Sequence, residues 1–257
     1  MARIPLPPGI LARPIAHRAL HERAAGRIEN SCAAIRAAIE GGYGIEIDLQ
    51  LSLDGRAMVF HDETLDRLTA ETGPVAVRTA EELGRIALLG GEEAIPTLEE
   101  VLALIAGRVP LLVEIKDQSL TMGPTDGRLE AEAARLLTLY GGEVAVMSFN
   151  PHSIGHMARL APDIARGLTT SAYDPEDWAP LAPETCARLR EIPDYDETDS
   201  SFISHEAADL ARPRVAELKA RGAALLCWTV RSPEAEALAR RYAQNITFEG
   251  YRARFPT

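Results

Sequence analysis

Short apolar runs alternate with helix-like segments along this chain, and this alternation limits the folds that it can form. Leaving aside one hairpin, eight strand-like runs are separated mostly by segments with helical apolar spacing. A strand–helix repeat predicts parallel strands joined by crossover helices, and eight such units predict closure into a TIM (β/α)8 barrel. The expected strands span residues 14–18, 43–51, 111–116, 144–149, 166–170, 201–205, 224–230 and 245–248.

An open doubly wound sheet is the main alternative architecture. Its usual Gly-rich dinucleotide-binding turn is missing after the first expected strand, so we favour the barrel. The 257 residues are a common length for one such barrel, and we expect a single domain over residues 1–257. The first helix is capped by Asn30 or Ser31, and later helices are expected at 98–106, 129–139, 152–160, 184–189, 207–221 and 233–242.

A hairpin and an insertion interrupt the alternation after the second expected strand. The turn at residues 52–55 is too short for a parallel crossover, so residues 57–61 should run antiparallel to the strand before them. Residues 63–96 then form an insertion, with a short helix near 79–83. We expect this insertion to lie over the carboxyl-end rim of the barrel and to form one wall of a pocket.

Charged residues lie within two of the expected strands, on one face of each. Because side chains alternate between the faces of a strand, Glu46 and Asp48 point the same way, and so do Glu114 and Lys116. Charges that face inward from buried strands must be paired or bind a metal, since unpaired burial costs too much free energy. Three carboxylates without thiolates are hard oxygen ligands that suit Ca²⁺ or Mg²⁺, and also Mn²⁺. The pattern therefore predicts a metal-assisted site for an anionic substrate.

Further polar residues lie late in the expected strands, where barrel enzymes carry their active sites. Imidazole titrates near neutral pH, so a pair of histidines such as His17 and His61 can remove and deliver protons when a phosphodiester is cleaved. The planar fork of Arg18 can hold two phosphate oxygens. Lys116 either contacts phosphate or only pairs with carboxylates, and Trp228 either belongs to the core or stacks on the alcohol part of a substrate.

Composition and net charge limit the kinds of partner and the cellular compartment that we expect for this protein. The net charge of −11 argues against a nucleic-acid scaffold or electrostatic attachment to anionic membranes, so local cations must meet an anionic substrate. The three cysteines are widely spaced and form no CxxC motif, as expected of reduced thiols in the cytoplasm. Because we find no apolar segment of signal-peptide or membrane-spanning length, we expect a soluble cytoplasmic protein without stable membrane association.

Several short segments of the first half occur in a fixed order. They are His17-Arg18, Glu29-Asn30-Ser31, Glu46-Ile47-Asp48, Asp54-Gly55, His61-Asp62, Ile95-Pro96-Thr97-Leu98-Glu99-Glu100 and Glu114-Ile115-Lys116. This ordered set resembles the glycerophosphodiester phosphodiesterase family, within the phospholipase C-like phosphodiesterase superfamily. The second half matches mainly through Ser148-Phe149 and Trp228-Thr229-Val230. The resemblance implies a TIM barrel with a small insertion after its second strand.

The resemblance also implies hydrolysis of glycerophosphodiesters to glycerol 3-phosphate and an alcohol, with a divalent cation, usually Ca²⁺ or Mg²⁺. By position it implies metal ligation by Glu46, Asp48 and Glu114, acid–base catalysis by His17 and His61, and phosphate binding by Arg18 and Lys116. Two positions depart from the family pattern. Ala19 stands where the family usually has glycine, and Glu249 ends a closing strand that usually carries aspartate.

Three classes of function are compatible with these residues. A phosphoric diester hydrolase that acts on small glycerophosphodiesters is the leading interpretation. A related barrel could use the same residues on a phospholipid, as a phospholipase or as a lyase that releases a cyclic phosphate; that reading favours an apolar rim or a basic face, and neither is evident in the sequence. A non-catalytic phosphate-binding barrel predicts loss of a histidine or ligand, and all of them are present.

Overall fold

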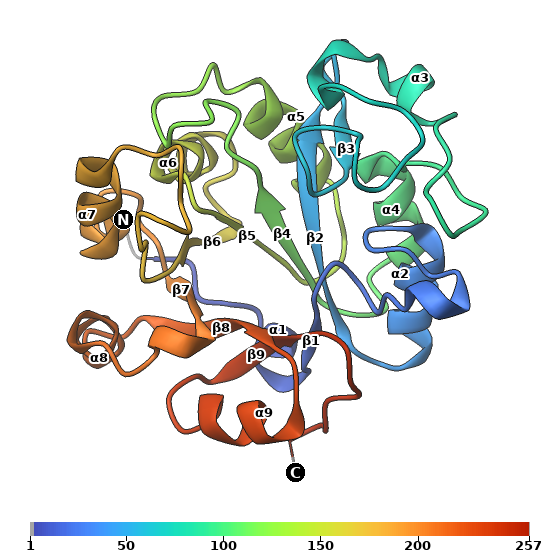
Figure 1. The fold of residues 1–257 in the computed structure, drawn as a ribbon. Coiled ribbons are helices and arrows are strands. Elements are labelled where there is room, and N and C mark those ends of the chain that lie inside the picture. Colours follow the sequence, from blue (N-terminus) through green and yellow to red (C-terminus); the bar gives the residue numbers. More distant parts are fainter. Residues whose placement is uncertain (1–2, 257) are drawn as a thin grey trace.

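The computed structural model describes residues 3–256 and contains a closed barrel of parallel strands with helices around its outside (Figure 1). The parallel strands are β1 (Ile15–Ala16), β2 (Gly44–Leu51), β4 (Leu111–Ile115), β5 (Val144–Ser148), β6 (Ala165–Thr170), β7 (Phe202–Glu206), β8 (Ala224–Val230) and β9 (Asn245–Phe248). β1 pairs with both β2 and β9, which closes the sheet. The predicted (β/α)8 barrel is confirmed.

The hairpin after β2 is also confirmed. β3 (Ala57–Val59) runs antiparallel to β2, with Leu49 opposite Val59. The chain then leaves the alternation for residues 63–96, which contain the short helix α3 (Ala80–Leu83). This insertion has a small apolar cluster of its own, which includes Leu65, Leu68, Val75, Leu83, Leu88 and Ile95 and also contacts Ile28, Met58 and Phe60. The insertion is thus packed onto the barrel by burial of apolar side chains.

The outer helices begin and end where local chemistry favours it. They are α2 (Cys32–Glu40), α4 (Leu98–Ile105), α5 (Arg128–Leu137), α6 (Pro151–Leu160), α7 (Pro183–Arg190), α8 (Pro213–Ala220) and α9 (Pro233–Ala239). Thr97 and Glu100 form a capping box at the start of α4. The helix predicted over residues 207–221 is wrong in its first part, because α8 begins only at Pro213. A proline lacks an N–H and disfavours helical backbone before it, so it takes the first turn.

The interior of the barrel changes from apolar to charged along the strand direction. At the amino ends of the strands, Leu112, Ala145, Phe202 and Leu226 form a buried cluster with Ile10 of α1 (Pro8–Ala12), a helix that the sequence analysis did not identify. Nearer the carboxyl ends, the inward positions are charged instead, as in the register pair of Asp48 and Glu114. The interior of the barrel is therefore apolar at the amino ends of the strands and charged near their carboxyl ends.

Candidate active site

Three carboxylates lie together at the carboxyl ends of β2 and β4. Glu46, Asp48 and Glu114 each present an oxygen within 4.8 Å of the others, and all three side chains are buried. The alternation of β2 places Glu46 and Asp48 on one face, and parallel pairing brings Glu114 beside Asp48. Buried carboxylates this close repel one another unless cations join them.

Lys116 supplies one such cation. Its Nζ lies 2.8 Å from Oδ1 of Asp48 and 2.5 Å from Oε1 of Glu114. Burial alone would raise the pKa of Asp48, but the charge of Lys116 holds it well below its usual range. The pKa of Glu46 is raised instead, because burial and the neighbouring charges of Asp48 and Glu114 outweigh the hydrogen bond that it accepts from the backbone N–H of Arg18.

The arginine after the first histidine lies close to the same cluster. Arg18 Nε is 3.6 Å from Oδ2 of Asp48, and Asn30 donates a hydrogen bond of 2.9 Å to the same oxygen. Arg18 and Ala19 both have positive φ, 51° and 64°, a region that disfavours residues with a Cβ. This backbone path lets the Arg18 N–H donate a hydrogen bond of 2.7 Å to Oε2 of Glu46. The strained turn after β1 thus helps to orient one member of the carboxylate cluster.

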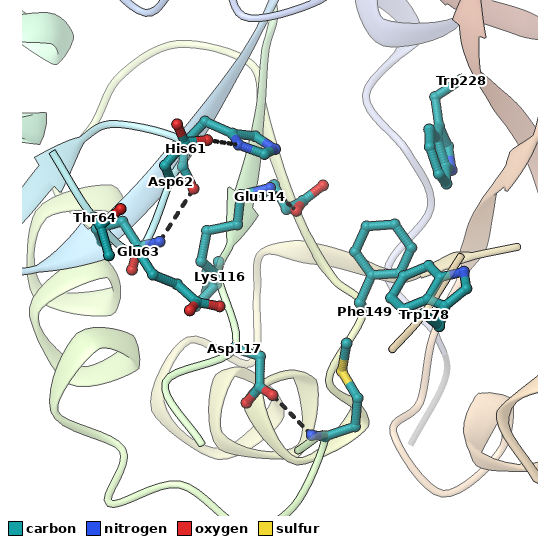
Figure 2. Close-up of a pocket in the computed structure, with 13 residues that line it drawn as sticks. His61, Asp62, Glu63, Thr64, Glu114, Lys116, Asp117, Phe149, Trp178 and Trp228 are labelled. Atoms are coloured by element: carbon teal, nitrogen blue, oxygen red, sulfur yellow. Dashed lines mark hydrogen bonds and ion pairs between the residues drawn. The ribbon is translucent and has the colours of Figure 1, made fainter. Parts of the chain in front are cut away.

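Both candidate histidines have a carboxylate at Nδ1. His17 Nδ1 lies 2.6 Å from Oε2 of Glu249, and His61 Nδ1 lies 2.7 Å from Oδ1 of Asp62. A carboxylate at one ring nitrogen holds the other toward its target and selects the tautomer. Burial lowers the pKa of His17, and the hydrogen bond with Glu249 partly offsets this by raising it. Figure 2 shows His61 beside Asp62, across from the aromatic side chains described next.

Two cavities adjoin these groups. The smaller, about 110 Å³, is lined by His17, Arg18, Glu46, His61, Glu114 and Lys116, together with residues of β8 and β9. The larger, about 540 Å³, continues past His61 and Lys116 to an aromatic side formed by Phe149, Trp178 and Trp228 (Figure 2). Five side chains line both cavities: His61, Glu114, Lys116, Phe149 and Trp228. A bound molecule can therefore place an anionic centre in the first and a larger substituent in the second.

The sequence profile of the Glycerophosphoryl diester phosphodiesterase family matches residues 17–246, a span that contains the three carboxylates, both histidines, Arg18 and Lys116 but not Glu249. The chain belongs to this family. The resemblance seen in its motifs is thereby confirmed.

Individual members of the family agree with this result. A glycerophosphodiester phosphodiesterase of Caldanaerobacter subterraneus is 37% identical over 160 residues, which cover 58% of this chain and 64% of the relative. One from Bacillus altitudinis is 41% identical over 152 residues, covering 55% of this chain and 61% of the relative. The matched part of this chain thus spans somewhat less than two thirds of these two relatives.

A solved structure extends the similarity over nearly the whole chain. A phosphodiesterase of Oleispira antarctica, in complex with the product sn-glycerol-3-phosphate, superimposes with a TM-score of 0.70 at 25% identity. The match covers 91% of each chain. No membrane-spanning helix is found in the part of our chain that the structure describes.

Family membership implies a divalent cation, and the residues present fit one. The donor set consists of carboxylate oxygens alone, as hard cations prefer, and the three groups converge without a thiolate or imidazole among them. Among the described residues Glu46 forms no ion pair, and a bound divalent cation would offset the burial and carboxylate charges that raise its pKa.

The sequence analysis missed several residues around the cavities. Trp178 and Met122 line the larger cavity from loops, where no periodic pattern points to them. Of the insertion, Glu63 and Thr64 at its start line this cavity, a smaller contribution than the wall that we expected. His205 is fully buried, contacts Thr170 and Asp209, and lines neither cavity.

Proposed function

We propose that this chain hydrolyses glycerophosphodiesters to glycerol 3-phosphate and an alcohol. The observation that carries the proposal is the convergence of three buried carboxylates and two carboxylate-paired histidines around one small cavity. Relatives named glycerophosphodiester phosphodiesterase support the reaction, and the product bound to the Oleispira enzyme supports the substrate class. The three cysteines of the present chain are free, which suits the reducing cytoplasm.

In this proposal Glu46, Asp48 and Glu114 hold a divalent cation, with Ca²⁺ or Mg²⁺ preferred and Mn²⁺ also suited to the oxygen set. When bound, such an ion neutralises phosphoryl charge and lowers the pKa of a hydroxyl or water. Lys116 and Arg18 add positive charge from the protein itself. Arg18 lines the small cavity, so its guanidinium can meet a phosphoryl oxygen there.

The histidines move the protons. Cleavage breaks the bond from phosphorus to the alcohol oxygen and forms one from phosphorus to the oxygen of a water molecule, either directly or after a glycerol hydroxyl has attacked first and water has opened the resulting cyclic phosphate. One of His17 and His61 accepts the proton of the attacking hydroxyl, and the other donates a proton to the departing alcohol. Both line the small cavity, and Glu249 and Asp62 hold their rings. The alcohol part of the substrate then lies in the larger cavity against Trp228.

The test is product analysis with purified protein. Glycerophosphodiesters that carry choline, ethanolamine, inositol and glycerol are incubated with and without a strong chelator, and the products are identified by mass spectrometry. We expect glycerol 3-phosphate and the free alcohol only in the presence of metal. A cyclic phosphate as end product, cleavage of phospholipids alone, or full turnover in chelator after exhaustive dialysis would contradict the proposal.

A further inference from the structure

One arginine of the insertion joins two carboxylates that come from different parts of the chain. Arg67 donates from Nε to Oδ2 of Asp62 at 2.6 Å and from Nη2 to Oδ1 at 2.9 Å. It also donates from Nη1 to Oε2 of Glu29 at 2.9 Å and from Nη2 to Oε1 at 2.7 Å. Both carboxylates are therefore held in two-point contacts, the geometry in which a guanidinium fixes orientation best.

Each carboxylate continues to a group that lines the small cavity. Oδ1 of Asp62 lies 2.7 Å from Nδ1 of His61, and Oε1 of Glu29 accepts a hydrogen bond of 2.7 Å from Nη1 of Arg18. The chain of contacts thus runs from His61 through Arg67 to Arg18. We call these five residues the arginine bridge: Arg18, Glu29, His61, Asp62 and Arg67. One end is a proposed acid–base histidine and the other a proposed phosphate ligand.

Arg67 is the member that keeps the other contacts in place. Burial raises the pKa of both carboxylates, but hydrogen bonds hold each pKa below its usual range: chiefly that of Arg67 for Glu29, and those of His61 and then Arg67 for Asp62. The Glu29 and Asp62 side chains are only 13% and 21% exposed, so water replaces a lost arginine incompletely. Without Arg67, the partly buried carboxylates of Glu29 and Asp62 would lose the hydrogen bonds that fix the orientation of their side chains.

We propose that Arg67 is a positioning residue for the cleavage reaction, which orients His61 through Asp62 and Arg18 through Glu29 at the same time. The inference rests on the proposed function for what these two ends do. It assigns a role in the reaction to the insertion, most of which lies away from the cavities. The competing reading is that Arg67 merely attaches the insertion to the barrel.

The two ends of the arginine bridge predict different kinetic defects. Asp62→Asn should lower kcat chiefly, because it loosens His61, whereas Glu29→Gln should raise KM chiefly, because it loosens Arg18. Arg67→Ala should do both and reduce kcat/KM by about 10–100-fold, the usual effect of removing a group that orients a reacting residue. Arg67→Lys, which lacks the planar fork, should recover only part of the loss.

The matched control is Arg78→Ala. Arg78 belongs to the same insertion and is similarly exposed, 37% against 47%, but its carboxylate partner is Glu71, which lines neither cavity. We expect its kcat/KM to stay within about twofold of wild type. Guanidinium at millimolar concentration should partly restore Arg67→Ala, and ammonium at equal ionic strength should not. Arg67→Ala kinetics equal to those of Arg78→Ala would overturn the proposal.

A second readout does not depend on activity. ¹⁵N NMR of the imidazoles should show His61 held in a single tautomer, with its proton on Nδ1 toward Asp62, in wild type and in Arg78→Ala. In Arg67→Ala the two tautomers should mix. If the wild type cleaves no glycerophosphodiester, the proposed function fails while this readout still tests the arginine bridge; unchanged tautomers in Arg67→Ala would refute the bridge alone.

Discussion

His17 and Glu249 are separated by 232 residues and meet at the seam where β1 pairs with β9. The backbone N–H of His17 donates to the carbonyl of Phe248, which brings His17 and Glu249 close to one another. Glu249 is also close to His21 and to Arg231, at 3.5 and 2.7 Å. The carboxylate therefore lies between two histidines and an arginine and can orient His17 in the way that Asp62 orients His61.

Removing this carboxylate should shift the titration of His17. Burial already lowers the pKa of His17 below 6.5, and the hydrogen bond with Glu249 is the main effect that raises it. In Glu249→Gln the pKa of His17 should fall further, so the ring stays neutral to lower pH. NMR titration of the imidazole measures this directly, and an unchanged or increased pKa would contradict it. If His17 is the base, the acid limb of kcat/KM should move to lower pH as well.

Loss of either histidine should remove most of the activity and leave the fold intact. His17→Ala and His61→Ala are each expected to lower kcat by about 10²–10⁴-fold, the usual contribution of a general acid or base. Steady-state kinetics on a substrate with a poor leaving group provide the measurement, and circular dichroism checks the fold. His152→Ala is the control, since His152 is an exposed residue of α6 that lines neither cavity. Near-normal kcat in either active-site variant would disprove its role.

At the scale of elements, α1 closes the amino end of the barrel. Asn245, at the start of β9, is fully buried and donates from Nδ2 to the carbonyls of Ile10 and Arg13, both at 2.6 Å. The last carbonyls of a helix lack partners within the helix, so this side chain satisfies groups that burial would otherwise penalise. The contact ties α1 to the barrel at the end opposite the carboxylate cluster.

Asn245→Ala should therefore lower stability and leave catalysis unchanged. We expect the free energy of unfolding to fall by about 2–4 kcal/mol, because two buried carbonyls lose their donor. Asn245→Asp has the same shape without the donor and should cost at least as much, which separates the hydrogen bonds from loss of volume. Urea unfolding measures the effect. Wild-type stability in both variants, or a large change in kcat at a temperature where they are folded, would be inconsistent with this account.

At the scale of the whole molecule, metal binding by the carboxylate cluster would be linked to folding. Glu46, Asp48 and Glu114 come together only when β2 and β4 pair, so an ion held by all three binds the folded state selectively. Their mutual repulsion in the folded protein is a cost that such an ion removes. The same cluster should thus govern both activity and the response of stability to divalent cations.

Divalent cations should raise the melting temperature of metal-free protein. At a concentration of about 100 times Kd, the expected gain is about 2.7 kcal/mol. Glu46→Gln and Asp48→Asn should each lose most of this gain and most of the activity, because one hard ligand is missing. Glu217→Gln is the control, since Glu217 is an exposed carboxylate of α8. A melting temperature that does not respond to Ca²⁺, Mg²⁺ or Mn²⁺ would contradict this prediction.

Local pattern was enough to predict the barrel and the core of its candidate site. The alternation of strands and helices determines parallel pairing, and the two-residue period of β2 places Glu46 and Asp48 on one face whatever the rest of the chain does. The antiparallel β3 followed from a turn too short for a crossover. These features depend on a few neighbouring residues, which is why the sequence by itself determined them.

Only the tertiary structure decided the partners of the reacting groups. Glu249 reaches His17 because barrel closure joins the first and last strands, and Arg67 reaches Glu29 because the insertion folds back onto the loop after β1. Trp178 joins the aromatic side of the larger cavity from a loop without periodicity. Such contacts join distant segments through irregular backbone, whose path is set by packing of the whole molecule and leaves no local pattern in the sequence.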